Sequence, residues 1–327
     1  MFHNLLPLLA LCANPVRAQL LQCSANTVGT TYNGTAGSEQ QLNSTTIRTV
    51  PARDANQGVA VDATHYYSID NYSITKHHKA NGTAIQQWAG SPSGPIIHLD
   101  GGTVINGTLF CPHSNYPQSP ITSSVETWDV ATMQHTHSHS FGIYRGSLTW
   151  VDQHPYTGVW YGAFANYDRV QAGQVAPYGL TMNTQLVEFV DGVDWEVARS
   201  WIFPEELRQS FSPMSNSGGS FGRDGWLYVA GHDASEVYVM GFPSAGSILT
   251  WVATIQAPEI AGQGIAWDRS GLNGTAVTGQ TGSLYGISRE SREVVEMEAP
   301  LQNCTGGLPL QVGRALPPGQ FEDVGGD

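Results

Sequence analysis

Three histidines occupy comparable places in the sequence, each beside a short apolar run typical of a β-strand: His98, His113 and His232. Imidazole changes its charge near neutral pH, so a neutral histidine can take a proton from a substrate and later return it. A single histidine is more often structural than catalytic, but three that face one cavity favour acid–base chemistry. We therefore predict catalytic roles for all three, with His113 and His232 as the main acid–base candidates.

Other polar side chains stand at the same kind of place, where a strand begins or ends, and Tyr116 and Trp150 offer aromatic faces. The acids could orient the histidines or hold a divalent cation in a central channel, the amides could bond hydroxyl groups, and the rings could stack on a sugar. The alternative is that such residues only satisfy backbone groups or water near a strand end. The predicted ligand-binding residues are Gln57, Asp70, Asn115, Tyr116, Trp150, Asn166, Asp168, Asp233 and Gln263.

These residues belong to a repeat that begins at Gln57 and ends near Glu298. Each unit has four strand-like runs in roughly 40–50 residues, which is typical of one blade of a β-propeller. We predict an all-β fold, a single propeller with five four-stranded blades. Six or seven blades stay possible because the third unit is long, and a β-sandwich is the main rival. The predicted innermost strands are Gly58–Asp62, Gly102–Asn106, Leu148–Asp152, Gly218–Gly222 and Gly264–Asp268.

Neighbouring strands in a blade are antiparallel, so the start of strand one, the end of strand two and the link from strand two to strand three share one face. Long links gather on this face, which favours a functional role for it. One of them, Cys111–Pro120, contains prolines that restrict φ on either side of His113, Asn115 and Tyr116. We expect this loop to form one wall of a pocket. In the last blade, strand two is expected to end at Gln280.

The ends of the chain indicate export. Residues 1–18 read as a secretory signal peptide with an apolar core and small residues before the cleavage site. Seven N-x-S/T sequons agree with a secreted glycoprotein. The propeller is expected over residues 19–304, with a disordered tail over 305–327. Of the remaining cysteines, we expect Cys23 to pair with Cys304, and Cys111 to be a buried small hydrophobe.

The formal net charge of −13 argues against nucleic acid or an anionic membrane as a partner. The apolar run of the signal is too short to cross a bilayer, and no second apolar run follows it. We expect a secreted monomer that binds a small molecule or glycan. The nature of any cofactor stays open, including whether a cation is bound at all.

Several segments resemble a family of secreted propeller proteins often labelled cycloisomerase-like. The similar stretches are "QGVAVD", "HSNYP", "GSLTWVD", "SNSGGSFG…DGWLYVAGHD" and "GQGIAWDRS", and the resemblance runs from about Ala52 to Val295. The family label reflects similarity to lactonase-type propellers. The resemblance implies the fold and assigns neither a reaction nor a catalytic residue.

The sequence therefore predicts a secreted propeller enzyme that acts on a sugar, uronide or lactone in a pocket on the face defined above. The enzyme class stays open between lyase, hydrolase and lactonase, since no motif of a known catalytic class is present. The alternative is a propeller that binds a glycan or peptide in the same pocket without catalysis.

Overall fold

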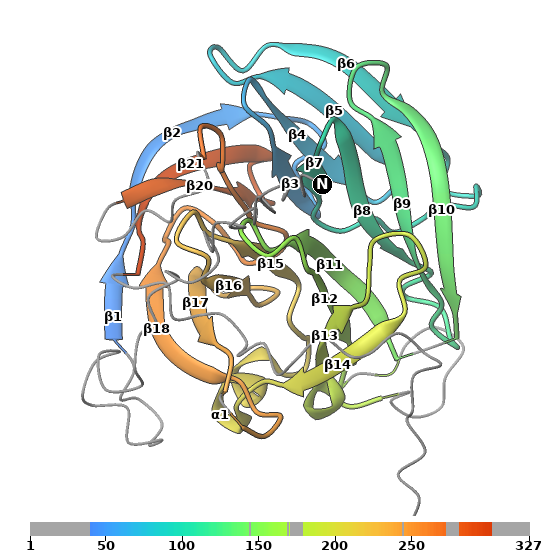
Figure 1. Ribbon diagram of the computed structural model, residues 1–327. Coiled ribbons are helices and arrows are strands. Elements are labelled where there is room, and N and C mark those ends of the chain that lie inside the picture. Colours follow the sequence, from blue (N-terminus) through green and yellow to red (C-terminus); the bar gives the residue numbers. More distant parts are fainter. Residues whose placement is uncertain are drawn as a thin grey trace, which may run out of the picture.

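Five four-stranded blades are arranged in a ring in the computed structural model, which describes residues 40–143, 145–168, 170, 179–243, 245–272 and 281–302 (Figure 1). The prediction of a single five-bladed β-propeller is confirmed. The innermost strands also lie where the repeat predicted them, within one or two residues at most ends.

Each blade is an antiparallel sheet whose strands follow one another from the axis outward. The first blade contains β3 (Gly58–Val61), β4 (His65–Asp70), β5 (Ser73–His78) and β6 (Ala84–Ala89). The second contains β7 (Thr103–Ile105), β8 (Thr108–Ser114), β9 (Ser123–Asp129) and β10 (Gln134–Gly142). The third contains β11 (Ser147–Gln153), β12 (Trp160–Ala165), β13 (Gln185–Phe189) and β14 (Val197–Ile202).

The last two blades each include a strand from the N-terminal part of the chain. The fourth contains β15 (Gly218–Phe221), β16 (Leu227–Ala230), β17 (Glu236–Gly241) and β18 (Thr250–Gln256), with β1 (Gln40–Asn43) added in parallel to β18. The fifth contains β19 (Ala266–Trp267), β20 (Thr281–Ser288), β21 (Glu293–Pro300) and, outermost, β2 (Thr45–Pro51). Two short helices, η2 (Thr181–Asn183) and α1 (Glu205–Phe211), lie in the links around the third blade.

The hydrophobic core is divided into five main clusters, one at each junction between neighbouring blades. Because the inner strands are covered on both faces, they read as continuous apolar or glycine-rich runs instead of alternating ones. Large aromatic side chains fill the junctions: Trp226 and Trp267, for example, are 2% exposed and lie in the cluster between the fourth and fifth blades.

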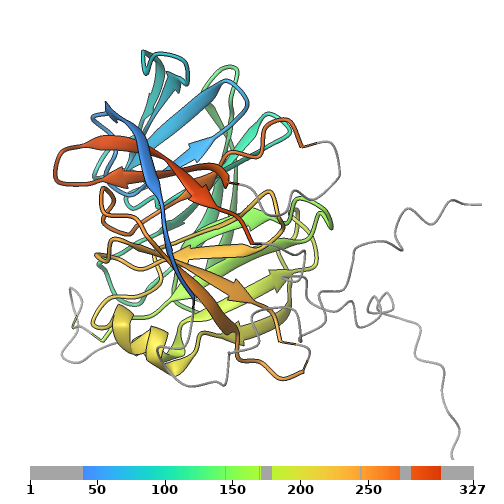
Figure 2. The same ribbon diagram turned by 90° about the vertical axis from the view of Figure 1, so that its left-hand side faces the viewer.

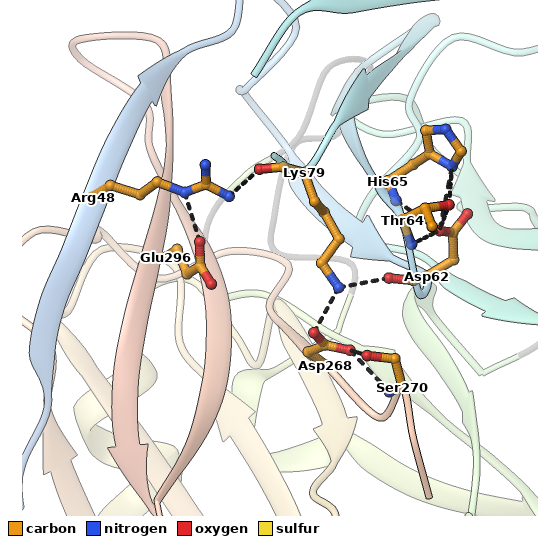
Figure 3. A network of polar contacts seen from close by, with 8 residues as sticks. All are labelled: Arg48, Asp62, Thr64, His65, Lys79, Asp268, Ser270 and Glu296. Atoms are coloured by element: carbon orange, nitrogen blue, oxygen red, sulfur yellow. Dashed lines mark hydrogen bonds and ion pairs between the residues drawn. The ribbon is translucent and has the colours of Figure 1, made fainter. Parts of the chain in front are cut away.

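The ring is closed by the N-terminal strands, because β2 pairs with β21 at the outer edge of the fifth blade. Figure 2 shows β1 and β2, in blue, crossing the outer edges of the last two blades. Arg48 on β2 pairs with Glu296 at 2.7 Å and also donates to the backbone carbonyl of Lys79 in the first blade (Figure 3). Lys79 in turn pairs with Asp268 of the fifth blade at 2.6 Å. Charged contacts thus fasten the first blade to the last.

Glycines bring the backbones of several blades into contact at the axis. A Cβ atom placed on Gly58 would lie 2.6 Å from the Cα of Gly101 and 2.9 Å from the Cα of Gly264. A Cβ on Gly218 would lie 2.1 Å from the carbonyl oxygen of Gln263. Only glycine fits where backbones approach this closely. This contact separates the axis into a top region, where the innermost strands begin, and a bottom region, where they end.

Several predictions concern residues outside the described ranges. They include the signal peptide over 1–18, the tail over 305–327 and the Cys23–Cys304 disulfide, and these stay predictions. Cys111 is free and fully buried, as expected. None of the helices in the described part of the chain has the length and apolar character needed to cross a membrane.

Candidate functional site

The top region gathers polar side chains from four blades, the first, second, fourth and fifth. They come either from just before an innermost strand or from just after a second strand, because antiparallel pairing places these two positions next to each other. Gln57, for instance, precedes β3 and its backbone N–H bonds the carbonyl of Ile69 near the end of β4 at 2.9 Å. The cluster, called the top cluster below, consists of Gln57, Asn71, His98, Asp100, Tyr116, His232, Asp233, Gln263 and Arg289.

His98 is held in one tautomer by two neighbouring amides. Its Nδ1 lies 2.8 Å from the side-chain oxygen of Asn71, and the amide of Gln57 donates to the same oxygen at 2.9 Å. An amide oxygen only accepts, so Nδ1 carries the hydrogen and Nε2 keeps its lone pair. Burial, followed by the nearby His113 and Arg289, lowers the pKa of His98 to about 4. At neutral pH His98 is therefore an uncharged base.

Asp100 lies beside this base and is almost completely buried. Its Oδ1 is 4.0 Å from Nε2 of His98, and its side chain is 5% exposed. Its Oδ2 has no hydrogen-bond partner among the described residues. Burial raises the pKa of this carboxyl well above its usual range, although the charge of Arg289 opposes the shift. The structure thus places a carboxylic acid next to an uncharged imidazole.

Arg289 and His232 complete the top cluster from the fifth and fourth blades. Nδ1 of His232 bonds Asp233 at 2.6 Å, and the guanidinium of Arg289 lies 3.4 Å from Nε2 of His232. Gln263 donates to the backbone carbonyl of His232 at 3.3 Å. No acidic side chain forms an ion pair with Arg289 within the described residues. Its positive charge therefore faces His98, which is uncharged at neutral pH, and Asp100, whose pKa is raised by burial.

Tyr116 is the member of the proline-rich loop that reaches this cluster. Its ring lies 5.0 Å from that of His98 and 5.2 Å from that of Tyr167, between centroids. Asn115 instead holds the loop together, because its amide donates to the carbonyl of Pro120 and its oxygen accepts from the backbone of Thr122. The loop thus contributes an aromatic wall and not a hydrogen-bonding amide.

His113 takes a different position from the one predicted for a catalytic residue. Its Nε2 accepts the backbone N–H of Ile97 at 3.2 Å, and its Nδ1 bonds Ser124 at 2.9 Å. Ser124 then donates to Glu126 at 2.6 Å. Burial lowers the pKa of His113. Since both ring nitrogens are occupied inside the second blade, neither is available to a ligand in this conformation.

The geometry also revises four predicted ligand-binding roles. The Trp150 indole is 1% exposed and donates to Asn216 at 2.7 Å, so it has no free face for a sugar ring. The polar residues are used in links or ion pairs: Asn166 donates to the carbonyl of Arg145, Asp168 accepts from Thr181 and Ser212, and Asp70 pairs with Arg292 at 3.0 Å. The three polar residues lie at or just after strand ends, where side chains are also needed to satisfy backbone groups.

The bottom region contains a cavity of about 410 Å³, lined by the ends of the innermost strands and the links that follow them. At this end of the axis, Asp152 near the end of β11 and Arg269 just after β19 form an ion pair at 2.7 Å. Asp152 is 1% exposed and also accepts from Thr103, Ser220 and the backbone of Phe221, so it connects four blades. This carboxylate has its bonding capacity filled by the protein itself.

His154, which also lines the bottom cavity, is equally occupied. Its Nε2 bonds the carbonyl of Gly225 at 3.2 Å, and its Nδ1 accepts the backbone N–H groups of Tyr156 and Thr157. Burial lowers its pKa to about 4. Asp152 and His154 at the bottom therefore have their polar atoms occupied, whereas Asp100 at the top has an oxygen without a hydrogen-bond partner among the described residues.

Metal binding was one possible role for the predicted acids. Among the described residues, no group of three or more His, Cys, Asp or Glu side chains is arranged to hold a metal ion. The chemistry available in the top cluster is therefore argued from proton transfer and hydrogen bonding alone.

Two central members of the top cluster were missed by the sequence prediction. Asp100 stands in "HLDGG", where an acid before two glycines is typical of a turn. Arg289 was missed because strand two of the fifth blade was placed too early: β20 ends at Ser288, so Arg289, and not Gln280, occupies the equivalent of His232. A correct register of the fifth unit would have identified Arg289.

Comparisons with known proteins support the fold alone. No family model matches the sequence, and no curated protein matches it, so the cycloisomerase-like resemblance stays a prediction. The glutaminyl cyclase of Myxococcus xanthus is similar in structure, with a TM-score of 0.54, 12% identity, and coverage of 80% of this chain and 98% of that one. An aldose sugar dehydrogenase from Streptomyces coelicolor, in its PQQ-bound form, has a TM-score of 0.44 and 13% identity, with coverage of 79% of this chain and 98% of that one.

Proposed function

We propose that this protein is an enzyme that uses general acid–base catalysis in the top cluster, with a sugar-derived lactone as substrate. The observation that carries the proposal is the pairing of His98 and Asp100. A base of fixed tautomer faces a buried, unpartnered carboxyl at 4.0 Å. A buried polar group without a partner costs stability, so its retention favours a role toward a ligand.

The reaction follows from the two protonation states. Nε2 of His98 takes a proton from water, and the water oxygen attacks the lactone carbonyl carbon. The bond between that carbon and the ring oxygen breaks, and the carboxyl proton of Asp100 passes to the departing oxygen. The product is a hydroxy acid, and the protonated His98 then reprotonates Asp100. The 4.0 Å between Nε2 of His98 and Oδ1 of Asp100 suits this reaction, because the attacking and leaving oxygens are attached to the same carbon.

The remaining residues of the top cluster support this step. Asn71 and Gln57 keep the lone pair of His98 directed away from them. Arg289 would stabilise the negative charge that develops on the carbonyl oxygen. Tyr116 would cover one face of the sugar ring. His232, held by Asp233, would keep Arg289 in place.

The test is hydrolysis of a panel of sugar lactones, with neutral glycosides and polyuronides as comparison substrates. His98→Gln and Asp100→Asn should each lower kcat by roughly 100-fold or more, as expected when an acid or base is removed. His113→Gln is the matched control, because it removes another buried imidazole whose nitrogens are already occupied. Full lactone hydrolysis by a folded His98→Gln variant would overturn the proposal.

The pH profile gives a second readout. Because His98 must be uncharged, activity per folded molecule should fall as the pH drops through about 4. Because Asp100 must be protonated, activity should also fall on the alkaline side. Binding of sugars without any turnover across the panel would instead favour the non-catalytic glycan-binding propeller.

A further inference from the structure

The top cluster contains an arginine that no carboxylate of the described residues contacts directly, in a strongly acidic protein. The chain as a whole has a formal net charge of −13. Within the cluster, burial raises the pKa of Asp100 and lowers the pKa of His98, and so disfavours the charged form of each. Asp70, which faces His98 from the first blade, is paired with Arg292 at 3.0 Å. Arg289 is then the cation of this region that no carboxylate neutralises directly.

The one acid near Arg289 lies on the far side of an imidazole ring. Asp233 bonds Nδ1 of His232, while Arg289 contacts Nε2 of the same ring. The side chain of Asp233 is 76% exposed, so water screens its charge. Asp233 therefore orients His232 and leaves the guanidinium able to bind another anion.

The hydrogen-bonding groups around Arg289 match a carboxylate. A guanidinium presents parallel N–H donors that fit two carboxylate oxygens, and a protonated carboxyl such as Asp100 adds an O–H donor. Nε2 of His98 supplies an acceptor for a neighbouring hydroxyl group. Together these residues offer donors for an acid group and an acceptor for the hydroxyl next to it.

We infer that Arg289 is the binding residue for a carboxylate, and that the natural ligands of the top cluster are sugar acids and their lactones. This inference rests on the proposed function, because it places the acid end of the same ligand. It adds that the hydroxy-acid product should bind well and that neutral sugars should not.

The inference is tested by calorimetric titration of the full chain with matched pairs of ligands. D-Gluconate and sorbitol differ only in one carboxylate, as do D-glucuronate and glucose at a different carbon. The wild-type protein should bind at least one acid roughly 10- to 100-fold more tightly than its neutral partner, the range expected for hydrogen bonds to a charged group. Equal binding within both pairs, or no binding of either acid, would overturn the inference.

Variants then locate the preference. Arg289→Gln should reduce it to about twofold or less, and Arg289→Lys, which keeps the charge but not the paired donors, should fall in between. Arg292→Gln is the matched control, because it removes the same charge only three residues along the chain. Arg292 is already paired with Asp70, and its side chain is 44% exposed. A preference that survives in Arg289→Gln, or disappears equally in Arg292→Gln, would contradict the assignment.

The outcome is separable from that of the proposed function. If His98→Gln abolishes turnover while the acid preference is absent, the catalytic proposal stands and this inference fails. If the acid preference depends on Arg289 but no lactone is hydrolysed, the carboxylate site stands and the catalytic proposal fails.

Discussion

The two ends of the propeller axis use buried charge in opposite ways. At the bottom, Asp152 of the third blade accepts hydrogen bonds from three other blades, including those from its ion-pair partner Arg269. At the top, Asp100 is as deeply buried but has an unpartnered oxygen, and Arg289 has no ion pair within the described residues. A buried polar group whose hydrogen bonds are all made holds neighbouring elements together. A buried polar group without a partner costs stability, but it can still bond a ligand. The difference teaches that burial alone does not distinguish a structural acid from a functional one.

The largest expected effect is at the bottom. Asp152→Ala would leave the charge of Arg269 buried without a partner, which typically costs about 3–5 kcal/mol. Chemical denaturation should show this loss, while Arg289→Gln at the top should cost less than about 1 kcal/mol. Replacing both members of the pair, as Asp152→Ala with Arg269→Met, should recover part of the stability. A change in Asp152→Ala below about 1 kcal/mol would end the contrast between the two ends.

Acid should destabilise both ends through their histidines. His98 and His154 have a pKa of about 4 in the folded protein and an ordinary value of 6.5 when unfolded. Between these values the unfolded chain binds protons that the folded one does not, so stability falls as the pH drops from about 6.5 toward 4. Each histidine should account for about 2–3 kcal/mol of the loss at pH 4.5. The loss between pH 7.5 and 4.5 should shrink by that amount in His98→Gln and in His154→Gln; an unchanged loss would contradict the pKa assignments.

The glycine contact that separates the two ends should be sensitive to a single methyl group. The Cβ of Gly58→Ala would meet backbone atoms at 2.6 and 2.9 Å, which cannot move aside as a side chain can. Overpacking of this kind costs about 1–3 kcal/mol, measurable by denaturation. Gly241→Ala on β17 is the control, because its nearest neighbour is a side-chain atom at 3.3 Å. Equal stability of the two variants would mean that the axis is less tightly closed than described.

The smallest expected effect has the opposite sign. Asp100→Asn replaces a carboxyl whose pKa is raised by burial with an uncharged group of the same shape. Because the raised pKa makes the ionised form unfavourable in the folded protein, the variant should be more stable at neutral pH, by about 0.5–2 kcal/mol. Thermal unfolding at pH 7.5 would show a higher Tm alongside lost activity. A lower Tm would indicate that Asp100, like Asp152, is structural.

The fold could be predicted from the sequence because the repeat is regular. Inner strands such as Gly58–Val61 and Gly218–Phe221 are short and bounded by turn residues in every unit. The fifth unit was the exception, since only two residues of its inner strand, Ala266–Trp267, are paired. Because of this irregularity, the end of strand two was predicted too early in the sequence, and Arg289 was not recognised as a site residue.

The site was only partly predictable, because side-chain direction is not encoded in the position of a strand end. His98 and His113 are both beside the second blade's first two strands, yet one has a free ring nitrogen and the other has none. Trp150 lies on an inner strand, but its side chain enters the junction between blades. Which histidine is free depends on hydrogen bonds to Asn71 and Ile97, which only the folded structure defines.

The closure by β2 sets the order in which the chain can finish folding. Arg48 and its partner Glu296 are 248 residues apart in sequence. At the usual speed of translation, β2 leaves the ribosome roughly 10–50 s before the strand it must pair with has been made. Four blades can assemble during that time, but the fifth cannot be completed before β21 has been made. The nascent chain therefore carries β2 unpaired until β21 appears, and only then does the ring become whole.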